Sequence, residues 1–361
     1  MSGFALGAEL SLLIRCCQWN FVTGGGEQPL ELPTDADWNL VVALARRHRV
    51  QGLVWNALSR QADRLPDHAR EVLSFEARSI AATNLGFAGE CRELQEKFEQ
   101  AEIPLLFVKG LTIAALAYRS PMLKLGWDID LLIDPADLAN AATLLRERGY
   151  ALRLPSEHAQ LQAWHAGSKE SVWSRDESFF IELHTRLADN RRLIPTIDAH
   201  SPRQLVEVVE GTKLHTLAEE ELFAYLAVHG ASSAWFRLKW ISDFAALLNG
   251  RSAEEIGLLY RRSQELGAGR AAGQALLLAD GLFEVLRPVP ALRSRLASDR
   301  ATLMLCRAAA RMLADSIREP TERVLGTLTI HWTQFLLQPG LAFKLSELRS
   351  QGAGLLRRFT R

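Results

Sequence analysis

The feature that most constrains the fold is a pair of aspartates inside an apolar run. Residues 127–134 read WDIDLLID, so one residue separates Asp128 from Asp130. A strand turns alternate side chains to opposite faces. A strand here would place Asp128 and Asp130 on one face, about 7 Å apart, and Ile129 and Leu131 on the other. Two carboxylates so placed repel each other unless a positive charge lies between them, and a divalent cation with oxygen ligands would supply it.

A motif this short also has a plain structural interpretation. Two loop aspartates can cap the start of a strand, and aspartate is disfavoured inside strands. Asp134-Pro135 in the same segment is typical of a cap before a helix. The aspartate pair alone therefore leaves both interpretations open.

The surrounding residues predict a small mixed α/β unit at roughly 100–195. Short apolar runs are typical of buried strands, and segments with apolar residues at helical spacing alternate with them. We expect strands at 105–108, 129–133, 150–154, 170–174 and 178–183, and helices at 111–118, 135–149 and 157–166.

On either side of this unit the pattern predicts helices. One is expected at 35–50 with Thr34 as its N-cap, and a long one at 66–102 that ends before Ile103-Pro104. After about residue 215 apolar stripes recur at 218–229, 238–248, 254–266 and 270–286. We therefore predict an α+β fold: an N-terminal helical region (1–99), a small mixed-sheet core (100–195) and a C-terminal helical domain (196–361).

The composition of the chain argues against nucleic acid, structural zinc and a membrane as partners. The chain of 361 residues has 42 basic and 42 acidic residues, so no excess positive charge points to nucleic acid, and no basic tract interleaved with aromatics is present. The four cysteines lack metal-ligand spacing, which argues against structural zinc. No apolar run approaches the roughly 20 residues of a membrane span, and the N-terminus does not read as a signal peptide. We expect a cytoplasmic protein with no membrane association.

Two further segments carry groups that would act with the aspartates. Lys109-Gly110 ends one expected strand and precedes a helix, where glycine permits close approach and the helix N-terminus offers N–H groups to phosphate. A lysine in a turn is also common at a protein surface. Glu182 lies within an apolar run, so it faces either a functional partner or an arginine in a salt bridge. His184 shares its strand face and either contacts nucleotide or forms a hydrogen bond beside the site.

The order of these segments resembles the DNA polymerase β nucleotidyltransferase superfamily. More narrowly, FVKGLTIAALAY, LKLGWDIDLLID, IELH and LAVHGASSAWFRLKWISDFAALL are similar to a bacterial family of uncharacterised nucleotidyltransferases. The similarity extends over roughly residues 85–250 and rests on several segments in the same order.

The resemblance implies a metal-dependent nucleotidyltransferase that moves an NMP, AMP from ATP by default, to an acceptor hydroxyl or similar group. A small molecule, a peptide or a protein would be the acceptor. Asp128, Asp130 and Glu182 would bind two Mg²⁺ ions (or Mn²⁺), with Glu182 as metal ligand or general base. Lys109 and Gly110 stand where the superfamily usually has glycine followed by glycine or serine.

The resemblance also implies nucleotide contacts outside the aspartate strand. Lys124 stands where relatives tend to have arginine. Arg237 and Lys239 are candidates for triphosphate or acceptor contacts, or else belong to a solvated helix face. His229 is a nucleotide contact or a core histidine, and Trp240 fits the core better than a stacking platform.

The sequence is also compatible with other functions. A catalytically inactive interaction protein would keep the fold and work through its helical surfaces. A phosphohydrolase would use the same metals without an acceptor. A protein kinase is disfavoured because the chain has no glycine-rich loop and no HRD-type segment.

Overall fold

The computed structural model describes residues 6–21, 29–124, 126–315 and 317–359. Its central feature is a five-stranded sheet with the order β1-β2-β5-β4-β3. Strands β2 and β5 are parallel, and the other neighbouring pairs are antiparallel. The mixed sheet among many helices confirms the predicted α+β class. The strands are β1 (Leu106–Phe107), β2 (Ile129–Leu132), β3 (Ala151–Leu154), β4 (Glu170–Arg175) and β5 (Phe179–His184).

The register between β2 and β5 places the acidic residues of the two strands side by side. Asp130 lies opposite Glu182, and Leu132 lies opposite His184. Because side chains alternate along a strand, Asp130 and Glu182 project from the same face of the sheet. The alternate residues, Ile129 and Leu131 among them, belong to a buried cluster with α4 (Asp67–Gln100) and α6 (Leu138–Glu147).

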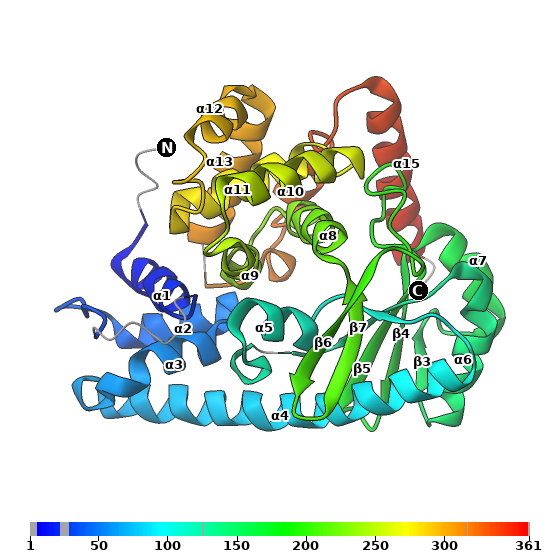
Figure 1. Cartoon of the computed structure of the whole chain (residues 1–361), viewed down its shortest axis with the longest axis horizontal. Coiled ribbons are helices and arrows are strands. Elements are labelled where there is room, and N and C mark those ends of the chain that lie inside the picture. Colours follow the sequence, from blue (N-terminus) through cyan, green and yellow to red (C-terminus); the bar gives the residue numbers. More distant parts are fainter. Residues whose placement is uncertain (1–5, 22–28, 125, 316, 360–361) are drawn as a thin grey trace.

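Helix α4 runs along the lower edge of the molecule, from the N-terminal helices to the sheet (Figure 1). Its buried Glu90 accepts hydrogen bonds from Tyr150 (2.9 Å), Arg148 (2.9 Å) and Arg175 (2.6 Å). Arg148 directly follows α6, Tyr150 directly precedes β3, and Arg175 is the last residue of β4. A single buried carboxylate thus fixes the helix against the sheet.

The segment that leads into Asp128 is held from two sides. Asn84 of α4 donates to the carbonyl oxygens of Pro121 (2.6 Å) and Lys124 (2.7 Å). On the other side Gly52 of α3 (Gln51–Leu58) packs directly against the backbone of Leu123. This packing leaves no room for a side chain at position 52.

The remaining helices form the two flanks. On the N-terminal side, α2 is capped by Asp37, whose side chain accepts from the N–H groups of Asn39 and Leu40. The expectation that Thr34 caps this helix was therefore wrong.

The flanking helices are α1 (Ala8–Trp19), α2 (Trp38–His48), α5 (Leu111–Tyr118), α7 (Leu161–Gly167), α8 (Glu219–Ser232), α9 (Leu238–Leu248), α10 (Ala253–Glu265), α11 (Arg270–Phe283), α12 (Pro290–Ser298), α13 (Arg300–Ala314), α14 (Leu328–Gln334) and α15 (Leu341–Phe359).

A β-hairpin interrupts the part of the chain that we expected to be helical. Strands β6 (Arg203–Val209) and β7 (Thr212–Leu217) pair antiparallel around Gly211, which has a φ of 75°. The hairpin contacts α4, α5 and β1. None of the helices in the described ranges combines the length and apolar character that crossing a bilayer requires.

Gly52→Ala should destabilise the protein, because the added Cβ would lie 2.3 Å from the carbonyl oxygen of Leu123. We expect a loss of about 1–3 kcal/mol, typical of overpacking. Gly86→Ala is the matched control, since nothing lies within 4 Å of its Cβ position on α4. It should stabilise the helix by about 0.5–1 kcal/mol. Urea unfolding of both variants measures the difference, and equal stabilities would contradict the packing at Gly52.

Candidate active site

Asp130, Glu182 and His184 form a compact cluster on one face of the sheet. Each offers a ligand atom, and these atoms all lie within 4.8 Å of one another. Nε2 of His184 is 3.1 Å from Oδ1 of Asp130 and 3.6 Å from Oε2 of Glu182. Asp130 and His184 are buried, whereas the Glu182 side chain is 27% exposed and therefore reachable from solvent.

Lys109 inserts its ammonium group between the two carboxylates. Its Nζ lies 2.6 Å from Oδ1 of Asp130 and 3.8 Å from Oε2 of Glu182. The lysine lies two residues after β1, and Gly110 follows as the residue before α5, with a φ of 70° that favours glycine. The predicted strand–Lys-Gly–helix segment thus lies directly beside the aspartate strand.

The two carboxylates differ in acidity. Burial would raise the pKa of Asp130, but Lys109 and the hydrogen bond from His184 outweigh it and hold this pKa well below its ordinary value. Burial raises the pKa of Glu182, and the neighbouring Asp130 charge adds to the rise against the opposing effect of His184 and Lys109. Asp130 therefore stays ionised, while Glu182 is the carboxylate that takes up a proton more readily.

Sequence reasoning missed a second ion pair behind the histidine. Nδ1 of His184 lies 3.3 Å from Oε2 of Glu170, and Glu170 forms an ion pair with Lys169. Burial opposes the ionisation of Glu170, but Lys169 and His184 lower its pKa to about 2. The antiparallel register sets Glu170 opposite His184. The ion pair could not be predicted from the sequence, because it depends on the pairing of β4 with β5, which the sequence alone does not specify.

Asp128 lies apart from this cluster. It is partly exposed and precedes the first residue of β2, beside Trp127, whose side chain is 58% exposed. Burial lowers the pKa values of Arg49 and Lys239, and the charge of Asp128 opposes this lowering; the same charge adds to the raised pKa of Lys109. Asp128 therefore faces the basic side of the site, and the cluster of close ligand atoms contains His184 in its place.

Lys124 is buried and paired rather than free for a ligand. Its Nζ lies 2.6 Å from Oδ2 of Asp243, and the hydroxyl of Tyr118 donates to Oδ1 of the same carboxylate at 2.9 Å. The pair joins the segment before Asp128 to α9. Lys124 also lines a narrow cavity with Lys109, Gly110, Asp128 and Asp130.

The other predicted nucleotide contacts lie on α8 and at the start of α9. Burial lowers the pKa of His229, as do Lys109 and Lys169, and its ring contacts Trp240 edge-on at 5.5 Å. Arg237 binds both carboxylate oxygens of Glu319 and stacks over Phe236 and Trp240. His229 therefore faces the lysines of the site, whereas the charge of Arg237 is already met by Glu319.

Lys239 and Arg49 complete a basic rim beside Asp128. Burial, together with the positive charges of Lys124 and Arg49, lowers the pKa of Lys239 to about 7. The guanidinium of Arg49 lies 5.9 Å from the Trp127 ring centre. Arg49 was not predicted because it comes from α2, far from the motifs in sequence. The two side chains put positive charge close to Asp128, and Arg49 also lies 4.0 Å from Oε1 of Glu319.

Comparison with known families agrees with this geometry. A family model described as "Uncharacterised nucleotidyltransferase" matches residues 34–284. The chain belongs to that family. No curated protein and no solved structure matches it. The protein is therefore a nucleotidyltransferase. The matched range includes α2, α9 and the residues of the cluster and of the basic rim.

The donor set of this nucleotidyltransferase fits one divalent cation. Asp130 and Glu182 supply oxygen atoms, and His184 supplies a nitrogen from the same face. Carboxylates suit Mg²⁺ and Mn²⁺, and imidazole favours Mn²⁺ of the two. The carboxylate of Glu170 lies 3.3 Å from Nδ1 of His184 without a hydrogen bond between them, so it adds negative charge behind the ring.

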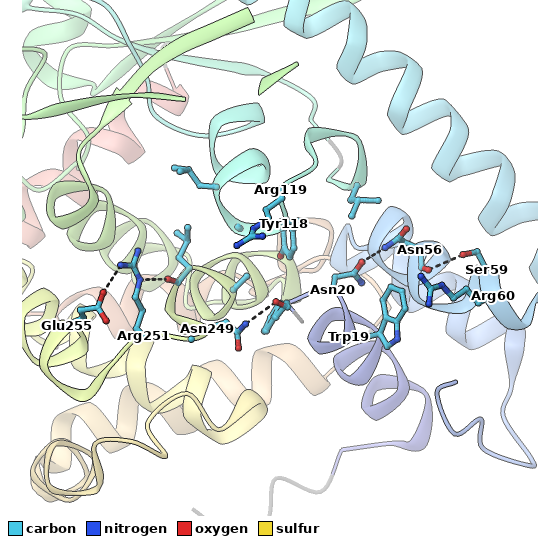
Figure 2. A pocket seen from close by; sticks show the side chains of 17 residues that line it. Trp19, Asn20, Asn56, Ser59, Arg60, Tyr118, Arg119, Asn249, Arg251 and Glu255 are labelled. Atoms are coloured by element: carbon cyan, nitrogen blue, oxygen red, sulfur yellow. Dashed lines mark hydrogen bonds and ion pairs between the residues drawn. The ribbon is translucent and has the colours of Figure 1, made fainter. Parts of the chain in front are cut away.

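A second cavity of the nucleotidyltransferase, of about 670 Å³, lies at the other end of α5 (Figure 2). Trp19, Asn56 and Arg60 line it on one side, and Tyr118 and Arg251 on the other. Its one acidic residue among those described, Glu255, pairs with Arg251 at 3.1 Å. It has no pair of carboxylates for a divalent cation, which leaves the cluster at Asp130 as the candidate active site.

The pKa of Lys239 gives a direct check on the basic rim. The pKa of Lys239 in the folded protein, about 7, lies below the ordinary lysine value of 10.5. Burying the charged ammonium therefore destabilises the fold, and this destabilisation is complete below pH 7. This penalty should disappear as pH rises from about 7 to about 10.5. In NMR spectra of ¹³C-methylated lysines, one resonance should titrate near pH 7 and vanish in Lys239→Arg. A nucleoside triphosphate should raise its midpoint, and a midpoint near 10 without ligand would contradict the assignment.

Proposed function

We propose that the protein transfers a nucleoside monophosphate from a nucleoside triphosphate to an acceptor hydroxyl. ATP is the default donor because it is the most abundant triphosphate. The acceptor is a small molecule, a peptide or a protein, and a cytoplasmic location forms part of the proposal. Membership of a nucleotidyltransferase family supports the reaction class.

The observation that carries the proposal is the register of β2 and β5. It places Asp130 beside Glu182 on adjacent parallel strands, with His184 two residues further along the same face. Buried like charges are costly to hold together. A site that keeps them is adapted to a positively charged ligand, and Mg²⁺ or Mn²⁺ fits this donor set.

The chemistry follows from the unequal acidity of the two carboxylates. The acceptor oxygen attacks the α-phosphorus and forms a new P–O bond, while the bond from the α-phosphorus to the bridging oxygen breaks. Pyrophosphate leaves with that electron pair, and Glu182, whose pKa is raised, accepts the acceptor's proton. Asp130 stays ionised as a cation ligand. When bound, the divalent cation would neutralise developing charge and acidify the attacking hydroxyl.

The triphosphate would be held by backbone and basic side chains. Gly110 and the N-terminus of α5 offer N–H groups close to Asp128. Lys239 and Arg49 supply positive charge on the other side of Asp128. We propose Lys124 as a positioning residue, because its ion pair with Asp243 fixes the segment before Asp128. Arg237 is a weaker candidate for a phosphate contact, since Glu319 already occupies its guanidinium.

One observation favours the catalytically inactive alternative. The ammonium of Lys109 already neutralises Asp130, so the carboxylates can remain buried without any metal. An interaction protein that kept the fold would need no more than this. Nucleotide binding separates the two functions.

Metal-dependent nucleotide binding should be lost in Asp128→Asn/Asp130→Asn. Calorimetry with ATP, GTP, CTP and UTP, with and without Mg²⁺, would measure it and identify the donor. We expect one triphosphate to bind the wild type only with metal, and the double variant to bind at least about tenfold more weakly, a loss of ~1.4 kcal/mol. Asp134→Asn is the matched control, because Asp134 caps the segment after β2 and pairs with His200 at the surface.

The control should bind like the wild type. Circular dichroism of the double variant is needed, since Asp130 is also half of a buried ion pair. If no triphosphate binds the wild type at millimolar concentration, the transferase proposal fails and the interaction protein takes its place.

A further inference from the structure

Lys109 is held where it reaches both carboxylates of the site. Its backbone is fixed between β1 and the start of α5, and the Cβ position of the next residue, Gly110, lies 3.9 Å from the carbonyl oxygen of Asp128. The side chain is only 17% exposed, so the lysine is enclosed in the site and does not extend into solvent. The departure from the superfamily's usual glycine at this position is therefore a change inside the site itself.

The ammonium group takes up space that a bridging cation would need. Nζ of Lys109 and Nε2 of His184 both contact Oδ1 of Asp130, at 2.6 and 3.1 Å. Both nitrogens also lie within 3.8 Å of Oε2 of Glu182. In two-metal sites the cations stand about 3.5–4 Å apart and share a carboxylate. A second divalent ion shared by Asp130 and Glu182 would press against the ammonium.

The charges of the site balance with one divalent ion and Lys109. Asp128, Asp130 and Glu182 carry three negative charges, and the nearby Lys169–Glu170 pair is neutral. One Mg²⁺ and one ammonium supply three positive charges, whereas two Mg²⁺ ions with Lys109 would leave an excess of two beside buried Asp130. This count covers the side chains and the cation alone, before the negative charge of a triphosphate and the positive charges of Lys239 and Arg49 are added.

We propose that the site binds a single divalent cation and that the Lys109 ammonium replaces the second one. The inference rests on the proposed nucleotidyl transfer and deepens it. Lys109 supplies a fixed positive charge between Asp130 and Glu182, and the one exchangeable ion is held by Asp130, Glu182 and His184. This differs from the two Mg²⁺ ions that the superfamily resemblance implies.

The number of bound Mn²⁺ ions tests the inference without any measurement of turnover. Calorimetry and electron paramagnetic resonance would count Mn²⁺ on the protein with an ATP analogue that has a methylene group between the α- and β-phosphorus. The variant is Lys109→Met, which keeps the aliphatic stem and removes the charge. Lys213→Met is the matched control, because Lys213 is exposed on β7, away from the site.

We expect one ion per chain, with the spectrum of an isolated Mn²⁺, in the wild type and in Lys213→Met. Lys109→Met should bind two ions close enough to give a spin-coupled spectrum. Two ions in the wild type would overturn the inference and leave the transferase proposal intact. No ion in the wild type would overturn both. If folded Lys109→Met binds only one ion, the ammonium does not exclude a second ion and the inference is overturned. If Lys109→Met does not fold, Lys109→Gln takes its place in the experiment.

Discussion

The repulsion between Asp130 and Glu182 is the constraint on which the rest of the site depends. Parallel pairing of β2 with β5 fixes these carboxylates side by side, one buried and one partly exposed. The surrounding groups act to reduce that repulsion. Lys109 lies between them, and His184 contacts both. Glu170 and Lys169 extend the alternation of charge behind the histidine. The polar interior is thus a chain of alternating signs rather than an isolated acidic pocket.

The site draws on segments far apart in sequence. Lys109 comes from the turn after β1, Arg49 from the residue after α2 and Lys239 from α9. The buried Lys124–Asp243 pair ties the segment before Asp128 to α9, and its loss would leave one charge unpaired in the interior. The helices on both sides therefore contribute groups to the site, and the match over residues 34–284 includes all of them.

Much of the local structure was predictable because it follows from short-range periodicity. The alternation in IELH placed Glu182 and His184 on one strand face, and α5 and α9 begin and end where the pattern indicated. That Asp130 projects from the same face of the sheet follows only from the β2–β5 register. Where two neighbouring residues could play the same local role, the sequence did not show which of them does so. Thr34 and Asp37 both suit an N-cap, and packing selects Asp37. The direction of the long Lys109 side chain and the pairing of Glu170 with His184 depend on strand neighbours that alternation does not specify. The hairpin β6–β7 was missed because Gly211, its turn glycine, was not read as a turn between two strands.

Helix α4 has a consequence for how the chain folds. At 34 residues it spans about 50 Å, and it is shared by the N-terminal helices, the segment before Asp128 and the sheet. Asn84 and Glu90, only six residues apart, join the two latter parts to the same helical turns. If α4 unwinds around Asn84 and Glu90, both the segment before Asp128 and the sheet lose their hydrogen bonds to it. The segment before Asp128 and the sheet that carries Asp130 and Glu182 should therefore open together when this part of α4 unfolds.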